Sequence, residues 1–486
     1  MRKARALFAT LAALATTVAG GGESVDVLIR HASVVDVVQG RIVPNQDIAI
    51  RGDRIAAISA SREPAAWQAR DTIDAGGRYV IPGLTDMHVH FGGGDALIEE
   101  NRNLLPLYVA HGITAVRDAA GDLSASVFEW RDAVRSGRLP GPRIFTSGPK
   151  IEGRGSIWPG DTEIGTRAEL LAALDRLEAW HVDFVKLTDD KLSPGLFLMG
   201  VTEATRRGLR TSAHIPMGVT LDEAGAAGLS SIEHLGYLLK GGSPREREIA
   251  AQFRAGTLTR AQASQAIEDS FDPAVARAAF KRLAARGIAV TPTLNGSHVI
   301  AYLDRDDHAN DPYLRYIGPG LQATYAWRVE RAAKDDADAI QRRHARYERT
   351  AALLPLLSQA GVTILAGTDA GFLNSFDYPG IGLHDELALL VQAGLTPLEA
   401  LRAATVNGAK FLGHADDSGS LEAGKRADIV LLAVNPLVDI GATRGIEAVV
   451  LAGRVLRRGD LDALLARVAQ RVAQQSEAVQ ATIPVR

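Results

Sequence analysis

Short apolar runs separated by turn signals occupy both ends of the chain. Runs of this kind, rich in β-branched and aliphatic residues, lie at 26–30, 47–51, 427–432 and 448–455. Neither end alone holds enough strands for a stable sheet, because isolated pairs of strands are marginal in water. We therefore predict one small β-sandwich domain that is assembled from residues 20–80 and 413–459.

Between these ends, residues 81–412 alternate short apolar strands with helical stretches. The eight strand candidates lie at 84–89, 113–117, 143–146, 183–187, 210–213, 230–233, 288–291 and 363–367. Eight strands with intervening helices predict an α/β fold, specifically a (β/α)8 TIM barrel. The charged stretches at 243–286 and 321–360 have a helical pattern, and we interpret them as insertions in the loops that follow barrel strands.

The first residues have the organisation of an export signal. A basic stretch at 2–5 precedes an apolar stretch from 6 to about 15, and small residues follow at 17–19. This pattern predicts a signal peptide over residues 1–19 and a mature protein that is periplasmic or secreted. The apolar run is too short to cross a bilayer, and no cysteine follows it to carry a lipid, so we expect no membrane anchor.

The C-terminal segment, residues 460–486, has apolar side chains at helical spacing. The periodic positions are Leu461, Leu464, Leu465, Val468 and Val472. We predict a helix that either docks on the body of the protein or forms an interface, and we expect a homo-oligomer.

The composition limits the possible chemistry of the protein because one residue type, cysteine, is missing. The 486 residues include 54 Lys+Arg, 57 Asp+Glu and 12 His, but no Cys, and the net charge is −3. The absence of Cys excludes a disulfide scaffold, a thiol nucleophile, an iron–sulfur cluster and a Cys-bound zinc ion. The weak net charge gives no reason to expect a nucleic-acid partner. Any metal must be held mainly by His and carboxylates.

The first candidate metal motif is the pair His88 and His90. Residues two apart on a strand point to the same face, so both imidazoles can reach one ion. The pair ends an apolar strand and precedes Gly92-Gly93-Gly94. It therefore lies at the carboxyl end of a barrel strand, where active sites of such barrels are found.

Four further polar residues each end an apolar strand. They are Lys186, His214, His234 and Asp369. One βα unit of such a barrel averages about 30 residues, and the separations along the chain agree with consecutive or nearby units. The candidate residues then fall on barrel strands 1, 4, 5, 6 and 8.

With these residues in place, the sequence resembles the amidohydrolase superfamily, specifically the binuclear imidazolonepropionase/prolidase-like amidohydrolases. The resemblance covers nearly the whole chain after the signal peptide. Its motifs lie at 80–86, 365–369, 395–401, 403–405 and 419–428. Each motif alone is weak, but together they are specific.

The resemblance implies a site with two divalent metal ions, zinc by default, although the donor types also accept Mn, Co or Fe. His88, His90 and Asp369 resemble the ligands of the more buried ion. His214 and His234 resemble the ligands of the more exposed ion. Lys186 resembles the lysine that reacts with carbon dioxide to become N6-carboxylysine and bridges both. A lysine in this buried setting should have a lowered pKa, which favours the neutral, reactive amine.

The implied reaction is hydrolysis of an amide (C–N) bond by a hydroxide that bridges the metals. Asp369 would take the proton and pass it to the leaving nitrogen, and Tyr237 would donate a hydrogen bond to the developing oxyanion. The implied substrate is a small-molecule amide, such as an N-acyl amino acid, a dipeptide or an ochratoxin-type aryl amide.

Two departures from related sequences bear on specificity. One-metal deaminases of the superfamily usually carry Glu three residues after the strand-5 His, and here that residue is Met217. Several prolidase-like dipeptidases bind the substrate carboxylate with a Gly-Gly-His segment after strand 3. This chain has no His there, so Arg154 or Lys150 becomes the candidate for that contact.

Other interpretations stay open from the sequence alone. His298 and His384 follow strands 7 and 8 and are candidates for contact with the substrate. The same metal site would serve a cyclic-amide hydrolase or a lactonase. An unmodified Lys186 in a one-metal enzyme, and a metal-binding protein without turnover, are the remaining alternatives.

Overall fold

The computed structural model describes residues 23–63 and 65–482. The predicted signal peptide, residues 1–19, lies outside the described residues. Within the described part of the chain, no helix is both long and apolar enough to cross a bilayer.

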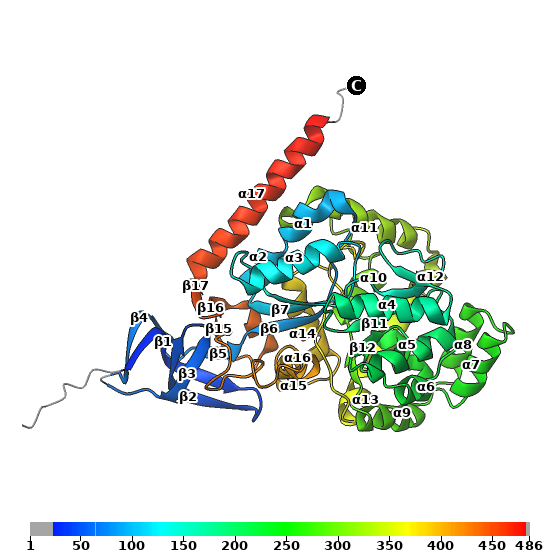
Figure 1. The fold of residues 1–486 in the computed structure, drawn as a ribbon, viewed down its shortest axis with the longest axis horizontal. Coiled ribbons are helices and arrows are strands. Elements are labelled where there is room, and N and C mark those ends of the chain that lie inside the picture. Colours follow the sequence, from blue (N-terminus) through cyan, green and yellow to red (C-terminus); the bar gives the residue numbers. More distant parts are fainter. Residues whose placement is uncertain (1–22, 64, 483–486) are drawn as a thin grey trace, which may run out of the picture.

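Strands from both ends of the chain form one mixed eight-stranded sheet, in the order β17-β16-β15-β5-β1-β2-β3 with β4 beside β1. The strands are β1 (Glu23–Asp36), β2 (Arg41–Arg51), β3 (Arg54–Ala60), β4 (Trp67–Asp74), β5 (Tyr79–Pro82), β15 (Ile429–Leu432), β16 (Ile446–Leu451) and β17 (Arg454–Arg457). Strand β5 joins the two ends, because it pairs parallel with β1 and antiparallel with β15. Figure 1 shows the blue and orange strands side by side.

The middle of the chain alternates short parallel strands with helices, as an α/β fold does. One sheet holds β6 (Leu84–Val89), β7 (Ile113–Asp118) and β8 (Arg143–Thr146). A second holds β9 (Ile151–Gly153), β10 (Thr162–Ile164), β11 (Val185–Leu187), β12 (Thr211–Ala213), β13 (Ser231–Glu233) and β14 (Ala289–Thr291). The backbone N–H of Asp183 donates to Thr146 O at 2.9 Å, which links the end of β8 to the segment that leads into β11.

The predicted eighth strand, 363–367, is not a regular strand, and in this detail the prediction is wrong. The segment instead makes isolated parallel bridges, Val290 with Ile364 and Val89 with Ala370, so it lies between β14 and β6. A Cβ at Gly367 would lie 2.8 Å from His88 N, which shows how closely the two backbones approach. The chain then leaves extended geometry at Asp369, whose φ is +79°.

Helices cover the parallel strands on their outer side (Figure 1). The α-helices are α1 (Ile98–Arg102), α2 (Leu105–Ala110), α3 (Ser124–Arg135), α4 (Arg167–Ala179), α5 (Pro194–Arg206), α6 (Leu221–Ala226), α7 (Glu246–Arg254), α8 (Arg260–Asp269), α9 (Pro273–Ala285), α10 (Leu294–Ala301), α11 (Pro319–Ala332), α12 (Ala337–Ala351), α13 (Leu354–Gln359), α14 (Ile381–Gln392), α15 (Pro397–Ala403), α16 (Val406–Leu412) and α17 (Arg458–Thr482). The 3-10 helices are η1 (Asp95–Leu97), η2 (Leu235–Gly242), η3 (Leu314–Tyr316) and η4 (Ile440–Arg444).

Local sequence signals explain where several of these helices begin. Thr166, Thr220, Thr259 and Thr396 each accept a hydrogen bond from the backbone three residues on, and the Glu or Gln there bonds back. This reciprocal capping satisfies N–H groups that the first helical turn leaves without partners. The stretches interpreted as insertions are indeed helical, and they supply α7 to α9 and α11 to α13.

The long helix α17 packs on the body through Leu461, Val468 and Val472, which are buried. It contacts α2 and η3 and then extends away from the rest of the molecule (Figure 1, red). The predicted helical tail is therefore present as a docked helix, and its role in an oligomer stays a prediction.

Candidate metal centre

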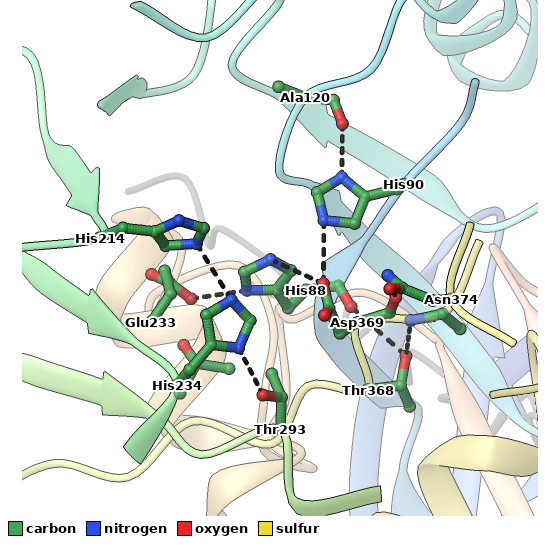
Figure 2. Close-up of polar contacts among 12 residues, drawn as sticks. His88, His90, Ala120, His214, Glu233, His234, Thr293, Thr368, Asp369 and Asn374 are labelled. Carbon is green, nitrogen blue, oxygen red and sulfur yellow. Dashed lines mark hydrogen bonds and ion pairs between the residues drawn. The ribbon is translucent and has the colours of Figure 1, made fainter. Parts of the chain in front are cut away.

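The sequence-predicted ligands come together at the carboxyl ends of the parallel strands. His88 is in β6 and His90 directly follows it, while His214 and His234 directly follow β12 and β13. The ring centroids of His88 and His234 are 5.0 Å apart, and those of His214 and His234 are 4.8 Å apart. Figure 2 shows these imidazoles converging around one point beside Asp369.

The deeper part of the cluster consists of His88, His90 and Asp369. Their candidate ligand atoms all lie within 4.8 Å of one another. Asp369 Oδ1 is 3.0 Å from His90 Nε2 and 3.4 Å from His88 Nε2. Burial alone would favour the neutral acid, but the surrounding imidazoles hold the pKa of Asp369 well below its usual value. Asp369 is therefore a carboxylate, as a metal ligand must be.

The outer part of the cluster consists of His214 and His234. Their Nε2 atoms face each other at 3.0 Å, while His234 Nδ1 lies 2.6 Å from Thr293 Oγ1. Burial, and secondarily the charge of Lys186, lowers the pKa of His214 well below its usual value. Burial lowers the pKa of His234 as well, and the converging Nε2 atoms suit the two rings to bind a cation together.

Lys186 lies in β11 and is 1% exposed. Burial lowers the pKa of its ammonium to about 7, so the neutral amine is accessible near neutral pH. Among the described residues, neither Lys186 Nζ nor His88 Nε2 has a hydrogen-bond partner. A bound metal ion would satisfy His88 Nε2, and carboxylation would satisfy Lys186 Nζ. The residues present therefore fit a metal site with a carboxylated lysine.

A buried carboxylate, Glu233, orients the deepest imidazole and was missed by the sequence analysis. Its Oε2 lies 2.8 Å from His88 Nδ1 and accepts a hydrogen bond from Arg117 Nη2 at 2.7 Å. Ser212 and Ser231 donate to its other oxygen. Because Nδ1 is engaged, His88 presents Nε2 to the site. A signal was present, since Glu233 directly precedes His234 and Arg117 ends the predicted strand at 113–117.

Tyr237, the predicted oxyanion donor, lies beside the outer imidazoles. Its ring stacks on His214 with centroids 5.1 Å apart and planes at 16°. Its hydroxyl donates to Asp189 Oδ1 at 2.7 Å, and Arg260 donates to the other oxygen of Asp189. Burial, followed by the charge of Asp189, raises the pKa of Tyr237 well above its usual value, so the phenol stays a hydrogen-bond donor.

Two of the predicted substrate contacts lie elsewhere. The side chain of Arg154, directly after β9, is 64% exposed and pairs with Glu169 on the surface. His384 is buried between Thr443 Oγ1 and the carbonyl of His111, where it joins α14 to η4. Neither position supports a contact with substrate.

The other two candidate substrate contacts are Lys150 and His298. Lys150 directly precedes β9, whose Ile151 pairs with Leu187, the residue after Lys186. Lys150 also forms an ion pair with Asp161 at 3.4 Å. His298 packs against Tyr302 and Tyr347 on the α10 side, with ring centroids 4.8 and 5.3 Å apart, and its role stays a prediction.

His and Asp side chains gathered at the carboxyl ends of parallel strands in an α/β fold are typical of metal-dependent hydrolases, and this protein has that arrangement. The chain belongs to the amidohydrolase family, whose model matches residues 79–456.

Curated relatives of this chain carry several names. It is 26% identical to imidazolonepropionase from Pseudomonas putida, over 89% of this chain and 98% of that protein. It is 24% identical to ochratoxinase from Aspergillus niger, over 74% of this chain and 71% of that protein. It is 27% identical to adenine deaminase 2 from Agrobacterium fabrum over 87% of this chain, but it spans only 56% of that deaminase.

A solved structure of a bottromycin amidohydrolase has the same fold. The TM-score is 0.71 with 24% sequence identity, and the match covers 92% of this chain and 90% of that one. At this identity the likeness supports the fold alone.

Proposed function

We propose that this protein is a metal-dependent amidohydrolase that cleaves an amide (C–N) bond of a small molecule. One observation carries the proposal: Lys186 Nζ and His88 Nε2 are buried without hydrogen-bond partners among the described residues, inside a cluster of imidazoles and a carboxylate. Buried nitrogen atoms without hydrogen-bond partners destabilise the folded protein unless a bound group satisfies them. Family membership points to the same chemistry.

Different residues of the chain would hold each of the two metal ions. His88, His90 and Asp369 would hold one divalent ion, and His214 and His234 would hold the other, with Lys186 bridging as N6-carboxylysine. When bound, two divalent ions, by default zinc, polarise a carbonyl and lower the pKa of water.

Two further groups act on the substrate. The Asp369 carboxylate accepts a proton from the attacking water and delivers it to the leaving nitrogen. The Tyr237 hydroxyl, after exchanging Asp189 for the carbonyl oxygen, donates to the developing oxyanion.

Deamination of a nucleobase is not favoured by this site. The residue three positions after His214 is Met217, and its thioether offers no carboxylate for proton transfer. The side chain of Met217 instead lines a cavity. The resemblance to adenine deaminases therefore supports the family and not their reaction.

The finer architecture and the cellular setting belong to the same proposal. The bridges of 363–370 to β14 and β6 support a closed (β/α)8 barrel, with the eight-stranded sheet folded as a β-sandwich. The domain limits are 20–80 and 413–459 for the sandwich, 81–412 for the barrel and 460–486 for the tail. Residues 1–19 would direct export to the periplasm or medium, and the mature enzyme would form a homo-oligomer with no nucleic-acid partner.

The decisive test combines metal content with a substrate screen. Elemental analysis of the purified protein should give two divalent ions per chain, and N-acyl amino acids, Xaa-Pro dipeptides and aryl amides should include a substrate. Turnover confined to lactones or cyclic amides would replace the proposal with that alternative. Metal binding without turnover of any of these compounds would leave a metal-binding protein and refute the enzyme.

A further inference from the structure

A cavity of about 360 Å³ opens on the His214 side of the metal centre. Its volume is within the range of small-molecule sites, which is about 300–1,000 Å³. Its walls come from η2 and from the inserted helices α8 and α12, which are not needed to complete the parallel strands. The apolar residues that line it are Ile215, Met217, Leu239 and Ile267.

The cavity adjoins the candidate metal centre, although none of the candidate ligands lines it. Tyr237 and Asp189 both line it, and Tyr237 stacks on His214. Asp189 Oδ1 also lies 3.9 Å from His214 Nδ1. We expect one substituent of a substrate bound at the metal centre to enter this cavity past Tyr237.

Other polar groups of the cavity already have partners within the protein. The two carboxylate oxygens of Asp189 accept from Tyr237 and Arg260. The buried ammonium of Lys240 donates to three backbone carbonyls, those of Ile215, Pro216 and Val219. These contacts fix the wall and occupy the hydrogen-bonding groups of Asp189 and Lys240.

Two arginines on α12, by contrast, share one carboxylate. Arg349 donates to Glu268 Oε2 at 2.7 Å, whereas Arg346 reaches Glu268 Oε1 at a longer 3.3 Å. Of these two, Arg346 lines the cavity, and its Nη2 would lie 3.9 Å from a Cβ placed on Gly236, next to Tyr237. Because one carboxylate serves two guanidiniums, the cavity carries surplus positive charge at Arg346.

We propose that this cavity binds one substituent of the substrate, an apolar group that ends in a carboxylate, and that Arg346 contacts that carboxylate. The inference rests on the proposed function, which places the scissile amide at the metal centre. The apolar walls bury the body of the substituent, and the guanidinium binds the carboxylate through charge-assisted hydrogen bonds. The substrate is then an amide with a free carboxylate several bonds from the cleaved C–N bond.

Calorimetric titration of the purified protein tests this without requiring turnover. The probes are 4-phenylbutyrate and its uncharged amide, 4-phenylbutanamide. We expect the acid to bind about tenfold more tightly than the amide, as one charge-assisted contact at a partly exposed arginine provides. Arg346→Met should abolish that preference. The matched control Arg349→Met removes a guanidinium from the same helix and the same carboxylate and should leave it intact.

A second variant tests the cavity itself. Ser264 lines it, and Ser264→Trp should fill the space and weaken both probes, with an unchanged melting temperature as evidence of folding. An acid preference that survives Arg346→Met would place the carboxylate elsewhere, for example on the metals, and overturn the inference. Loss of the preference in both arginine variants would also overturn it. Arg346-dependent binding with no amide hydrolysed would instead refute only the proposed function.

Discussion

Glu233 holds His88 in a fixed orientation: their Oε2 and Nδ1 atoms are 2.8 Å apart, and both side chains are fully buried. Arg117 reaches the same oxygen at 2.7 Å, so the carboxylate is charged in spite of its burial. The imidazole therefore has one nitrogen committed to the protein and one directed at Asp369. The most deeply buried candidate ligand is thus preorganised before any ion arrives.

Loss of this support should weaken metal binding. Glu233→Gln keeps the shape but removes the charge that His88 and Arg117 share, and we expect a 10–100-fold loss of metal affinity, typical of outer-sphere changes. Competition with a chelator measures it. Ser212→Ala, which removes one hydrogen bond to Glu233, serves as the milder control. Unchanged affinity in Glu233→Gln would show that His88 is not a ligand.

Lys186→Ala should reduce the metal content from two ions to at most one per chain and abolish amide hydrolysis. The substitution leaves space that a free short carboxylate can enter, so added propionate should partly restore metal content and activity. A merely structural lysine would give no such rescue. Full activity in the unsupplemented variant would contradict the bridging role.

Asp369→Asn should lower kcat by about 10²–10⁴-fold, because an amide side chain cannot accept and deliver the proton. Metal content must be measured alongside, since the same change removes a charged ligand. A variant that retains both ions yet turns over amides as fast as the wild type would exclude the proton transfer.

Tyr237→Phe should lower kcat by about tenfold or more while KM changes less, because the hydroxyl is expected to act on the developing oxyanion. Tyr302→Phe, directly after α10, is the control. An increase confined to KM would mean that Tyr237 only orders the wall of the cavity through Asp189.

Glu386 supplies a prediction about stability and pH. Burial raises its pKa from 4.5 to about 8, and its Oε2 accepts from the backbone N–H of Asn295 at 2.7 Å. The folded state therefore holds a proton that the unfolded state has already lost above pH 4.5. This contribution to the free energy of unfolding is complete below pH 4.5 and is lost as the pH rises toward 8. Glu386→Gln should reduce the loss in free energy of unfolding as the pH rises.

Thermal unfolding of the Glu386→Gln variant at pH 5, 6.5 and 8 measures the effect. The variant and the wild type should differ little at pH 5, and the variant should be the more stable by at least about 1 kcal/mol at pH 8. Parallel stability curves for the two proteins would show that Glu386 does not titrate in this range.

The sequence was most informative where side-chain chemistry and strand position coincide. His88, His90, His214, His234 and Asp369 could be placed because each ends an apolar run, and that position in a parallel fold has a defined direction. The residues that surround these ligands could not be placed from the sequence. Glu233 and Arg117, for example, are 116 residues apart in the chain and come together only in the folded structure. The three-residue strands β9 and β10 carried no periodicity to detect.

The cavity was also beyond sequence reasoning. Its helices were recognised as insertions, but which of their arginines faces inward depends on how α8 and α12 pack against η2. The same limit misplaced Arg154 and His384. Arg154 directly follows β9 and His384 lies in α14, and only the path of the backbone decides that one is on the surface and the other between elements.

The pairing of β5 with β15 has a consequence for biosynthesis. Strand β5 ends at Pro82, and β6 begins at Leu84 and leads directly to His88. Its partner strand is made only after residue 428, when nearly all of the chain has emerged from the ribosome. The joint sheet therefore cannot close before β15 has been synthesised, and a chain interrupted before β15 would leave β5 with an open edge next to the first metal ligands.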